Sequence, residues 1–72
     1  MNVLSVLQNM KDDVYFESSK DFIDDGLLDS FDIVTLVGEL EEAFDIEISG
    51  RDIVPENFVS LESIEEMVKK YQ

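Results

Sequence analysis

The chain contains no histidine, cysteine or tryptophan among its 72 residues, and only one proline. Without histidine it has no imidazole that could act as a general base near neutral pH. Without cysteine it has neither a thiolate nucleophile nor a soft metal ligand, and it forms no disulfide. Catalysis that depends on either residue is therefore excluded, and we expect a protein that is not itself an enzyme.

Basic residues are also scarce, because 5 lysines and arginines stand against 18 aspartates and glutamates, for a formal net charge of -13. This charge repels nucleic-acid phosphates and anionic lipid, so neither is an expected partner. The sequence has no basic region followed by an apolar run and no apolar stretch of membrane-spanning length. We therefore expect neither a signal peptide nor membrane insertion, and we predict a cytoplasmic protein that meets basic protein surfaces.

A chain of this length has room for one small core, and 44% of its residues are apolar. We predict a single domain over residues 1–72, without internal repeats. Apolar residues recur at helical spacing in three segments, and Pro55 can open a further single turn. The predicted helices cover residues 2–13, 30–43, 55–58 and 61–71. The predicted fold is all-α, a small four-helix bundle of three main helices plus a short third helix.

The segment over residues 15–29 lacks helical periodicity and is rich in turn-forming residues. Long loops of this kind are uncommon in compact domains and are often functional. Five apolar residues are expected to anchor the loop to the core: Phe16, Phe22, Ile23, Leu27 and Leu28. The second helix follows, with Asp29 or Ser30 as its N-terminal cap.

The hydroxyl of Ser30 is expected to face solvent at the start of this helix. No base in the chain can take its proton, so a reaction at Ser30 must be carried out by another protein. A phosphate attached there would lie at the positive end of a helix, where free amide groups favour an anion. Asp29 and Asp32 oppose that anion unless a divalent cation bridges them to the phosphate during transfer. The alternative is that Ser30 only caps the helix.

The run from Asp25 to Asp32, with the letters DGLLDSFD, resembles the acyl carrier protein family. The run over residues 40–48, with the letters LEEAFDIEI, resembles the same family, and so does the Leu-Val pair at 36–37. The resemblance extends over about residues 21–64 and fits the whole length of the chain. It implies a bundle that carries a covalent prosthetic group.

The resemblance also implies roles for individual residues. Ser30 matches the serine to which a phosphopantetheinyl transferase attaches 4′-phosphopantetheine, whose thiol holds an acyl or aminoacyl thioester. Asp29 matches the aspartate that helps to hold the magnesium of the transferase during this step. Phe31 departs from the usual leucine after the serine, and this departure bears on the choice of transferase and partners. The imported thiol explains why the chain needs no cysteine of its own.

The segment over residues 52–58 looks more like the D-alanyl carrier proteins than like fatty-acid carriers. This likeness implies a ligase that adenylates D-alanine and loads it, and a membrane-bound acyltransferase that takes it for cell-envelope acylation. Fatty-acyl or polyketide intermediates are the alternative cargo. We expect the carrier to act as a monomer.

One side of the second helix is the expected docking surface for partner enzymes, opposite its apolar stripe. We define this docking surface by seven residues: Phe31, Asp32, Val34, Thr35, Gly38, Glu41 and Glu42. By resemblance Glu41 and Glu42 match acidic positions of the family, whereas Thr35 replaces a position that is often acidic. Ordinary solvated helix surface is the alternative interpretation.

Two functions of a different class remain open from the residues alone. Counting Asp21 as position one of a twelve-residue calcium loop places Asp25, Asp29 and Asp32 at ligand positions. Ile23 offers no oxygen at position three, however, and Asp32 stands where a bidentate glutamate is usual. A small acidic adaptor, which would use the same helix surface without modification, is the other alternative.

Overall fold

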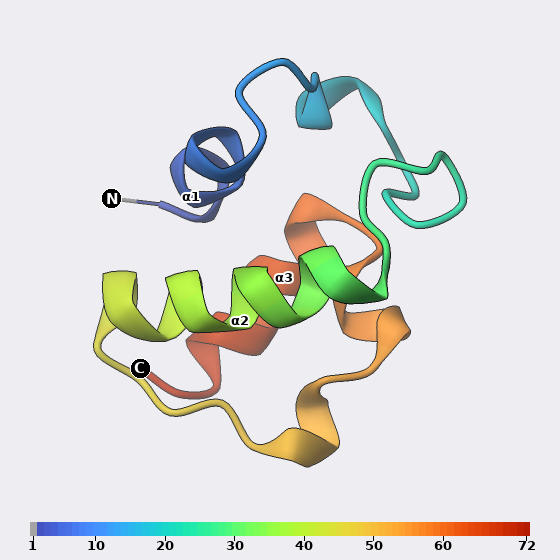
Figure 1. The fold of residues 1–72 in the computed structure, drawn as a ribbon. Helices are drawn as coiled ribbons and strands as arrows, with labels where there is room; N and C mark the ends of the chain where they lie inside the picture. The colour runs from blue at the N-terminus through green and yellow to red at the C-terminus, as the bar shows by residue number, and fades with distance from the viewer. Residues whose placement is uncertain (1) are drawn as a thin grey trace.

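Three α-helices make up the frame of the molecule. The computed structural model describes residues 2–72, and these contain only helices, 3₁₀ turns and connecting loops (Figure 1). The α-helices are α1 (Val3–Met10), α2 (Ser30–Phe44) and α3 (Leu61–Lys69). The 3₁₀ turns are η1 (Phe16–Ser18), η2 (Gly50–Asp52) and η3 (Pro55–Phe58). The prediction of a small all-α bundle is confirmed.

Helix α1 is shorter than the predicted helix over residues 2–13. It begins after Asn2, whose side chain accepts a hydrogen bond from the Ser5 amide at 2.8 Å, and it ends at Met10. Continuing it would place Asp12 and Asp13 at the negative end of the helix dipole. Lys11 instead leaves the helix, and its side chain reaches residues much later in the chain.

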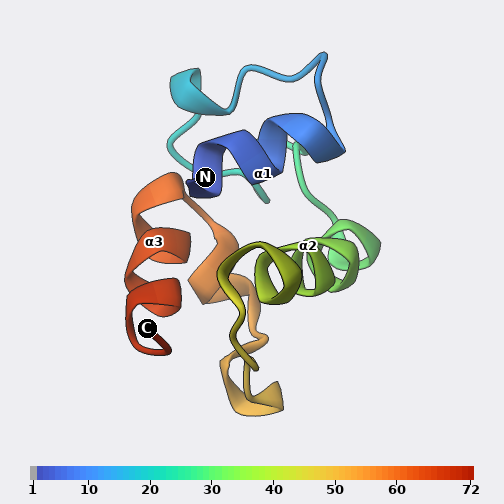
Figure 2. The same ribbon diagram turned by 90° about the vertical axis from the view of Figure 1, so that its left-hand side faces the viewer.

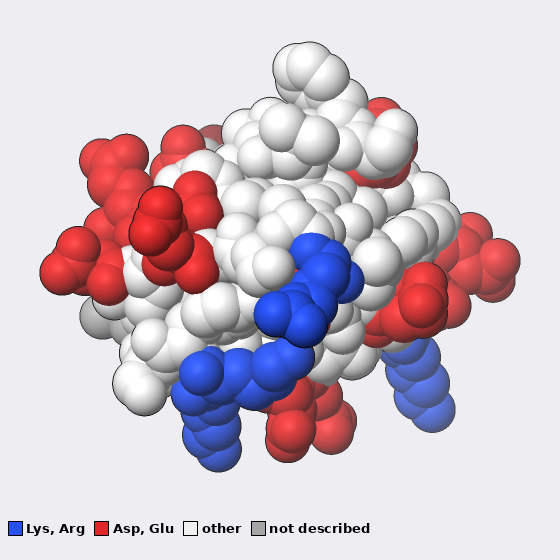
Figure 3. All heavy atoms as spheres, turned by 90° about the horizontal axis from the view of Figure 1, so that it is seen from below, with Lys and Arg blue, Asp and Glu red and all other residues white. Residues whose placement is uncertain are grey.

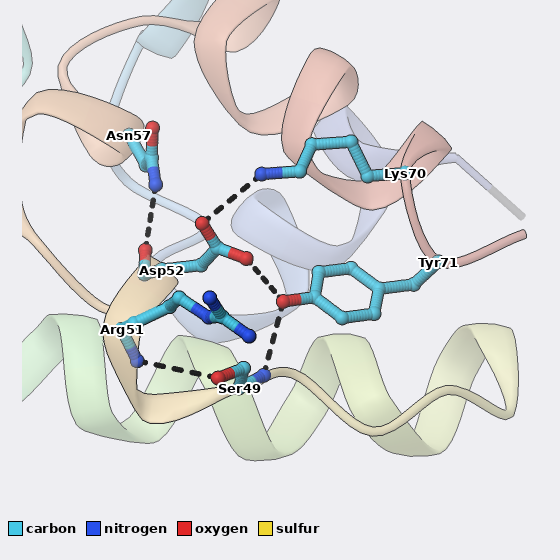
Figure 4. A network of polar contacts seen from close by, with 6 residues as sticks. All are labelled: Ser49, Arg51, Asp52, Asn57, Lys70 and Tyr71. Carbon is cyan, nitrogen blue, oxygen red and sulfur yellow. Dashed lines mark hydrogen bonds and ion pairs between the residues drawn. The ribbon is translucent and has the colours of Figure 1, made fainter.

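Helix α3 also ends before the predicted residue 71. Ser60 caps its start by accepting a hydrogen bond from the Ser63 amide at 3.1 Å, and the helix stops at Lys69. Figure 4 shows what lies beyond, because Lys70 and Tyr71 turn toward η2 and share the carboxylate of Asp52. The chain continues for one tighter turn, in which the Lys70 amide donates to the Met67 carbonyl at 3.1 Å and the Tyr71 amide to the Val68 carbonyl at 3.0 Å. The α-helical spacing therefore ends two residues before the predicted end.

The core forms where the apolar sides of the three helices meet. Figure 2 shows α1 lying above α2 and α3, and residues of α1 contact both of the other helices. The helices bury Val3, Val6, Leu7, Ile33, Leu36, Val37, Leu40, Ile64, Met67 and Val68. Ile48 and Phe58 complete the core from the side of η2 and η3. The radius of gyration is 11.0 Å, close to the value of about 11 Å expected for a compact chain of this length.

The segment predicted as a long loop over residues 15–29 is partly structured. It contains η1 and, after it, a helical turn in which the Asp25 amide donates to the Asp21 carbonyl at 2.9 Å. Phe16 and Phe22 are both buried, and their rings meet edge to face with centroids 5.2 Å apart. Leu28 is also buried, whereas Ile23 and Leu27 are half-buried. The five apolar residues thus attach the segment to the core, as predicted.

Acidic side chains cover much of the surface. Figure 3 views the molecule from the side of η2 and shows acidic groups on both flanks, with a few basic side chains gathered between them. One basic side chain, Lys70, forms an ion pair in which its ammonium lies 3.0 Å from Asp52 Oδ1. Within residues 2–72 no helix is long and apolar enough to cross a membrane.

Candidate functional site

The N-terminus of α2 is closed by a reciprocal pair of hydrogen bonds. Asp29 is the cap, and its Oδ1 accepts a hydrogen bond from the Asp32 amide at 2.8 Å. In return, Asp32 Oδ2 accepts one from the Asp29 amide at 3.2 Å. This capping box satisfies two amides that an uncapped helix leaves without partners. Because Asp29 supplies the cap, Ser30 is the first helical residue, exposed to solvent.

The chain reaches this cap through a sharp turn at Gly26. Gly26 has a φ of 76°, its amide donates to the Ile23 carbonyl at 3.0 Å, and the Leu27 amide donates to the Phe22 carbonyl at 2.7 Å. This pair of bonds is a Schellman motif, which ends a helical turn with a residue in the left-handed region that glycine adopts easily. The turn directs Leu28 into the core and leaves Asp29 and Ser30 outside it.

The lysine that directly follows α1 joins the two sides of this turn. The ammonium of Lys11 lies 2.7 Å from Asp32 Oδ2 and donates to the Leu27 carbonyl at 3.0 Å. The hydrogen bond from Lys11 is the main reason why the pKa of Asp32 is lower than its usual value. Sequence reasoning did not find Lys11, because the contact joins residues that are distant in the chain. The only feature of the sequence that pointed to Lys11 was that it is one of the few basic residues of the chain.

Some residues of the docking surface are exposed, and others form contacts within the chain. Phe31 and Val34 are large apolar side chains that are 78% and 68% exposed, on the side of α2 opposite the buried stripe. Thr35, Gly38 and Glu42 are exposed as well. The predicted surface therefore includes an apolar pair near Ser30 and at least one free carboxylate further along the helix.

Two acidic members of the docking surface have structural contacts of their own. Asp32 takes part in the capping box and pairs with Lys11, so its side chain is only 17% exposed. Glu41 is half-buried, and its Oε2 accepts a hydrogen bond from the Ile48 amide at 2.9 Å. Glu41 thereby holds the chain that leaves α2, a function that the helical spacing alone did not indicate.

The residues counted as a calcium loop act locally in turns. Asp21 Oδ1 accepts hydrogen bonds from the Ile23 and Asp24 amides, at 3.1 and 2.9 Å. The carboxylate of Asp25 accepts one from the Ser19 hydroxyl at 2.6 Å. Across residues 2–72 the structure brings together no group of three or more acidic side chains that could hold a metal ion. The local contacts of these aspartates are those of turn caps.

Comparison with known protein families identifies the family of the chain. A family model described as the phosphopantetheine attachment site matches residues 4–69, which include the Gly26 turn, α2, α3 and all of α1 except Val3. The chain belongs to this family. Searches of curated proteins and of solved structures found no match. The motif around Ser30 predicted that the chain is a member of the acyl carrier protein family. The match confirms this prediction at the level of the family.

Membership defines the general function of this phosphopantetheine carrier. The domain bears 4′-phosphopantetheine covalently, and such carriers interact with phosphopantetheinyl transferases and with enzymes that handle acyl groups. Carriers of this family are generally non-catalytic. The absence of histidine and cysteine from the chain agrees with this role, because the reactive thiol belongs to the attached group.

Proposed function

We propose that Ser30 is the residue to which 4′-phosphopantetheine is attached. The observation that supports this proposal best is the position of Ser30 at the first turn of α2, where it is exposed and free of the capping role taken by Asp29. When bound, the group supplies a flexible arm whose terminal thiol holds an acyl or aminoacyl cargo as a thioester. The chain itself supplies the anchor and the surface that partner enzymes recognise.

The start of α2 suits a phosphate ester in its electrostatics. The amides of the first helical turn and the helix dipole favour an anion near Ser30. The Ser30 proton must go to a base of the transferase, because this chain has no histidine to accept it.

The capping bond uses Oδ1 of Asp29, which leaves Oδ2 as an oxygen ligand for the magnesium ion during transfer. We propose Asp29 for this transient role.

We further propose that partner enzymes recognise the docking surface of α2. Phe31 and Val34 offer apolar contact area next to Ser30, and Glu42 offers an exposed carboxylate further along the same helix. Asp32, Thr35, Gly38 and Glu41 lie within this surface. Apolar contacts at the centre of an interface supply most of the affinity, while charges at its edge steer the approach of a basic partner.

For the cargo we propose D-alanine, loaded by an adenylating ligase and passed to a membrane-bound acyltransferase for cell-envelope acylation. The likeness of residues 52–58 to D-alanyl carriers supports this proposal. The filled core also supports a small cargo, because the large side chains of Phe16, Phe22 and Phe58 are fully buried in it. Fatty-acyl and polyketide cargo are the alternatives. The proposed carrier acts in the cytoplasm as a monomer.

Intact mass spectrometry tests the attachment residue. The purified chain is incubated with coenzyme A and a phosphopantetheinyl transferase of broad specificity, and its mass is measured before and after. The wild type is expected to gain one phosphopantetheine, Ser30→Ala none, and Ser18→Ala the same as the wild type, since Ser18 is an exposed serine of η1. A gain that survives in Ser30→Ala would contradict the proposal.

The cargo needs a separate experiment with the modified protein. The modified carrier is offered D-alanine, L-alanine and fatty acids together with its ligase and ATP, and the mass of the product is measured. We expect D-alanine to be loaded in preference to the others. Preferential loading of a fatty acid would contradict the D-alanine proposal and leave the attachment residue unaffected.

A further inference from the structure

Lys11 connects α1 to both sides of the turn that presents Ser30. Its ammonium donates to the Leu27 carbonyl at 3.0 Å, before Ser30 in the chain, and lies 2.7 Å from Asp32 Oδ2, after it. Asp32 Oδ2 is the same oxygen that accepts the hydrogen bond from the Asp29 amide. One cation therefore holds the carbonyl that enters the turn and the carboxylate that completes the capping box.

The contact is partly shielded from water. The side chains of Lys11 and Asp32 are 31% and 17% exposed, so solvent screens their attraction less than it screens a fully exposed pair. Hydrogen bonds that involve a charged donor are also stronger than those between neutral groups. Removing the ammonium leaves the Leu27 carbonyl without this donor and Asp32 without its cation.

The charge balance at the turn gives Lys11 a second effect. Ser30 lies between Asp29 and Asp32, and a phosphodiester attached to it adds a further negative charge in a chain whose formal net charge is already -13. Lys11 is the cation paired with this site, whereas Lys70 pairs with Asp52 on a different part of the molecule. The ammonium next to the capping box therefore lowers the electrostatic cost of bringing a phosphate to Ser30.

We propose that Lys11 is a positioning residue for the attachment of phosphopantetheine, which holds the Ser30 turn in place and offsets the charge of the incoming phosphate. The proposal rests on Ser30 as the attachment residue. Lys11 acts through Leu27 and Asp32, and no contact between Lys11 and the transferred group is needed. The ammonium of Lys11, which follows α1, thus fixes the geometry of the modified serine.

Steady-state kinetics of the transferase separate an effect of positioning from an effect of net charge. The varied substrate is the unmodified carrier over residues 1–72. Lys11→Met is compared with Lys11→Arg and with Lys20→Met, a matched control that removes an exposed lysine of the loop. Removing any lysine makes the carrier more acidic, which strengthens its attraction to a basic transferase and does not raise KM. Lost positioning instead lowers kcat.

We expect Lys11→Met to lower kcat about fivefold, as the loss of a partly shielded charge-assisted bond implies. Lys11→Arg keeps the charge and should recover most of the rate, and Lys20→Met should match the wild type. Equal kcat values for Lys11→Met and Lys20→Met would overturn the proposal. So would a failure of Lys11→Arg to exceed Lys11→Met.

Amide hydrogen exchange gives a readout that needs no transferase. The Asp29 and Asp32 amides of the capping box should exchange several-fold faster in Lys11→Met, and at the wild-type rate in Lys20→Met. Unchanged exchange of both amides in Lys11→Met would also overturn the proposal. A wild-type chain that gains no phosphopantetheine would contradict Ser30 as the attachment residue, and the exchange of these amides would still show whether Lys11 holds the turn.

Discussion

Asp52 accepts hydrogen bonds from two residues at the end of the chain. The Tyr71 hydroxyl donates to its Oδ2, and Lys70 lies 3.0 Å from its Oδ1 (Figure 4). The Tyr71 oxygen also accepts a hydrogen bond from the Ser49 amide at 3.1 Å, and the Asn57 side chain donates to the Asp52 carbonyl at 2.7 Å. These contacts fasten η2 to the end of α3.

The same contacts make the stability of the fold depend on pH. The hydrogen bond from Tyr71, followed by that from Lys70, holds the pKa of Asp52 below its usual value of 3.8. A carboxyl whose pKa is lowered by folding adds stability that is complete above the unfolded value and is lost as the pH falls through the folded value. The contribution of Asp52 should therefore be present at neutral pH and vanish in acid below 3.8.

We predict that Asp52→Asn lowers the melting temperature at neutral pH, and that the gap to the wild type narrows as the pH falls below 3.8. Asp13→Asn is the control, because it removes an exposed carboxylate from the turn after α1. Circular dichroism at a series of pH values measures both gaps. A gap for Asp52→Asn that stays constant through the acid range would contradict this account.

At the scale of elements, the turn at Gly26 prepares the entry into α2. A residue with a side chain is strained at a φ of 76°, although nothing lies within 4 Å of the position that a Cβ would occupy. The strain of the left-handed conformation costs about 1 kcal/mol for an ordinary L-residue. The backbone, and not a lack of space, therefore explains the glycine at this position.

We predict that Gly26→Ala lowers the free energy of unfolding by about 1 kcal/mol. Gly50→Ala in η2 is the matched control, because its site is equally open and its φ lies outside the left-handed range. Urea unfolding of both variants gives the comparison. Equal losses in the two variants would show that the left-handed conformation of Gly26 is not the cause.

The spacing of apolar residues predicted where the helices lie in the chain, but it did not predict the residues at which α1 and α3 end. The stripe of Ile33, Leu36, Val37 and Leu40 is buried as its spacing indicated, because helical periodicity and burial follow from the same geometry. Helix α1 ends early because Lys11 leaves the helical pattern for distant partners. The last turn of α3 tightens where the side chains of Lys70 and Tyr71 bind Asp52. Such contacts depend on the assembled fold, so no local sequence pattern predicts them.

In the candidate site, too, features that depend on neighbouring residues could be predicted, whereas contacts between distant residues could not. The exposure of Ser30 and the cap supplied by Asp29 both follow from residues next to each other. The sequence indicated the exposure, but it left the cap open between Asp29 and Ser30. The hydrogen bond from the Ile48 amide to Glu41 joins segments on two sides of a chain reversal. Three-residue 3₁₀ turns such as η1 are too short to produce a periodic signal.

At the scale of the whole molecule, the surplus of acidic residues favours basic partners. All 18 carboxylates lie between Asp12 and Glu66, around the Ser30 turn, α2 and the segments that follow it. Long-range attraction of this kind raises the rate of encounter and weakens with added salt. A carrier that visits several enzymes benefits from attraction that brings it near without holding it tightly.

We predict that Glu42→Lys slows loading by a partner enzyme more than Glu66→Lys does, although both variants change the net charge equally. Glu42 is exposed on the docking surface, whereas Glu66 is exposed on α3. Glu41→Lys is a poorer test, since Glu41 also binds the Ile48 amide. Loading rates at low and high salt provide the measurement. Equal rates for the two variants would contradict recognition through α2.

The central claim, attachment at Ser30, is tested most directly by locating the group within the modified wild-type chain. Trypsin cuts after Lys20 and Arg51, and the peptide over residues 21–51 contains three hydroxyl residues: Ser30, Thr35 and Ser49. Fragmentation of this peptide by tandem mass spectrometry should place the added phosphopantetheine on Ser30. An added mass on Thr35, on Ser49 or on another peptide would contradict the claim.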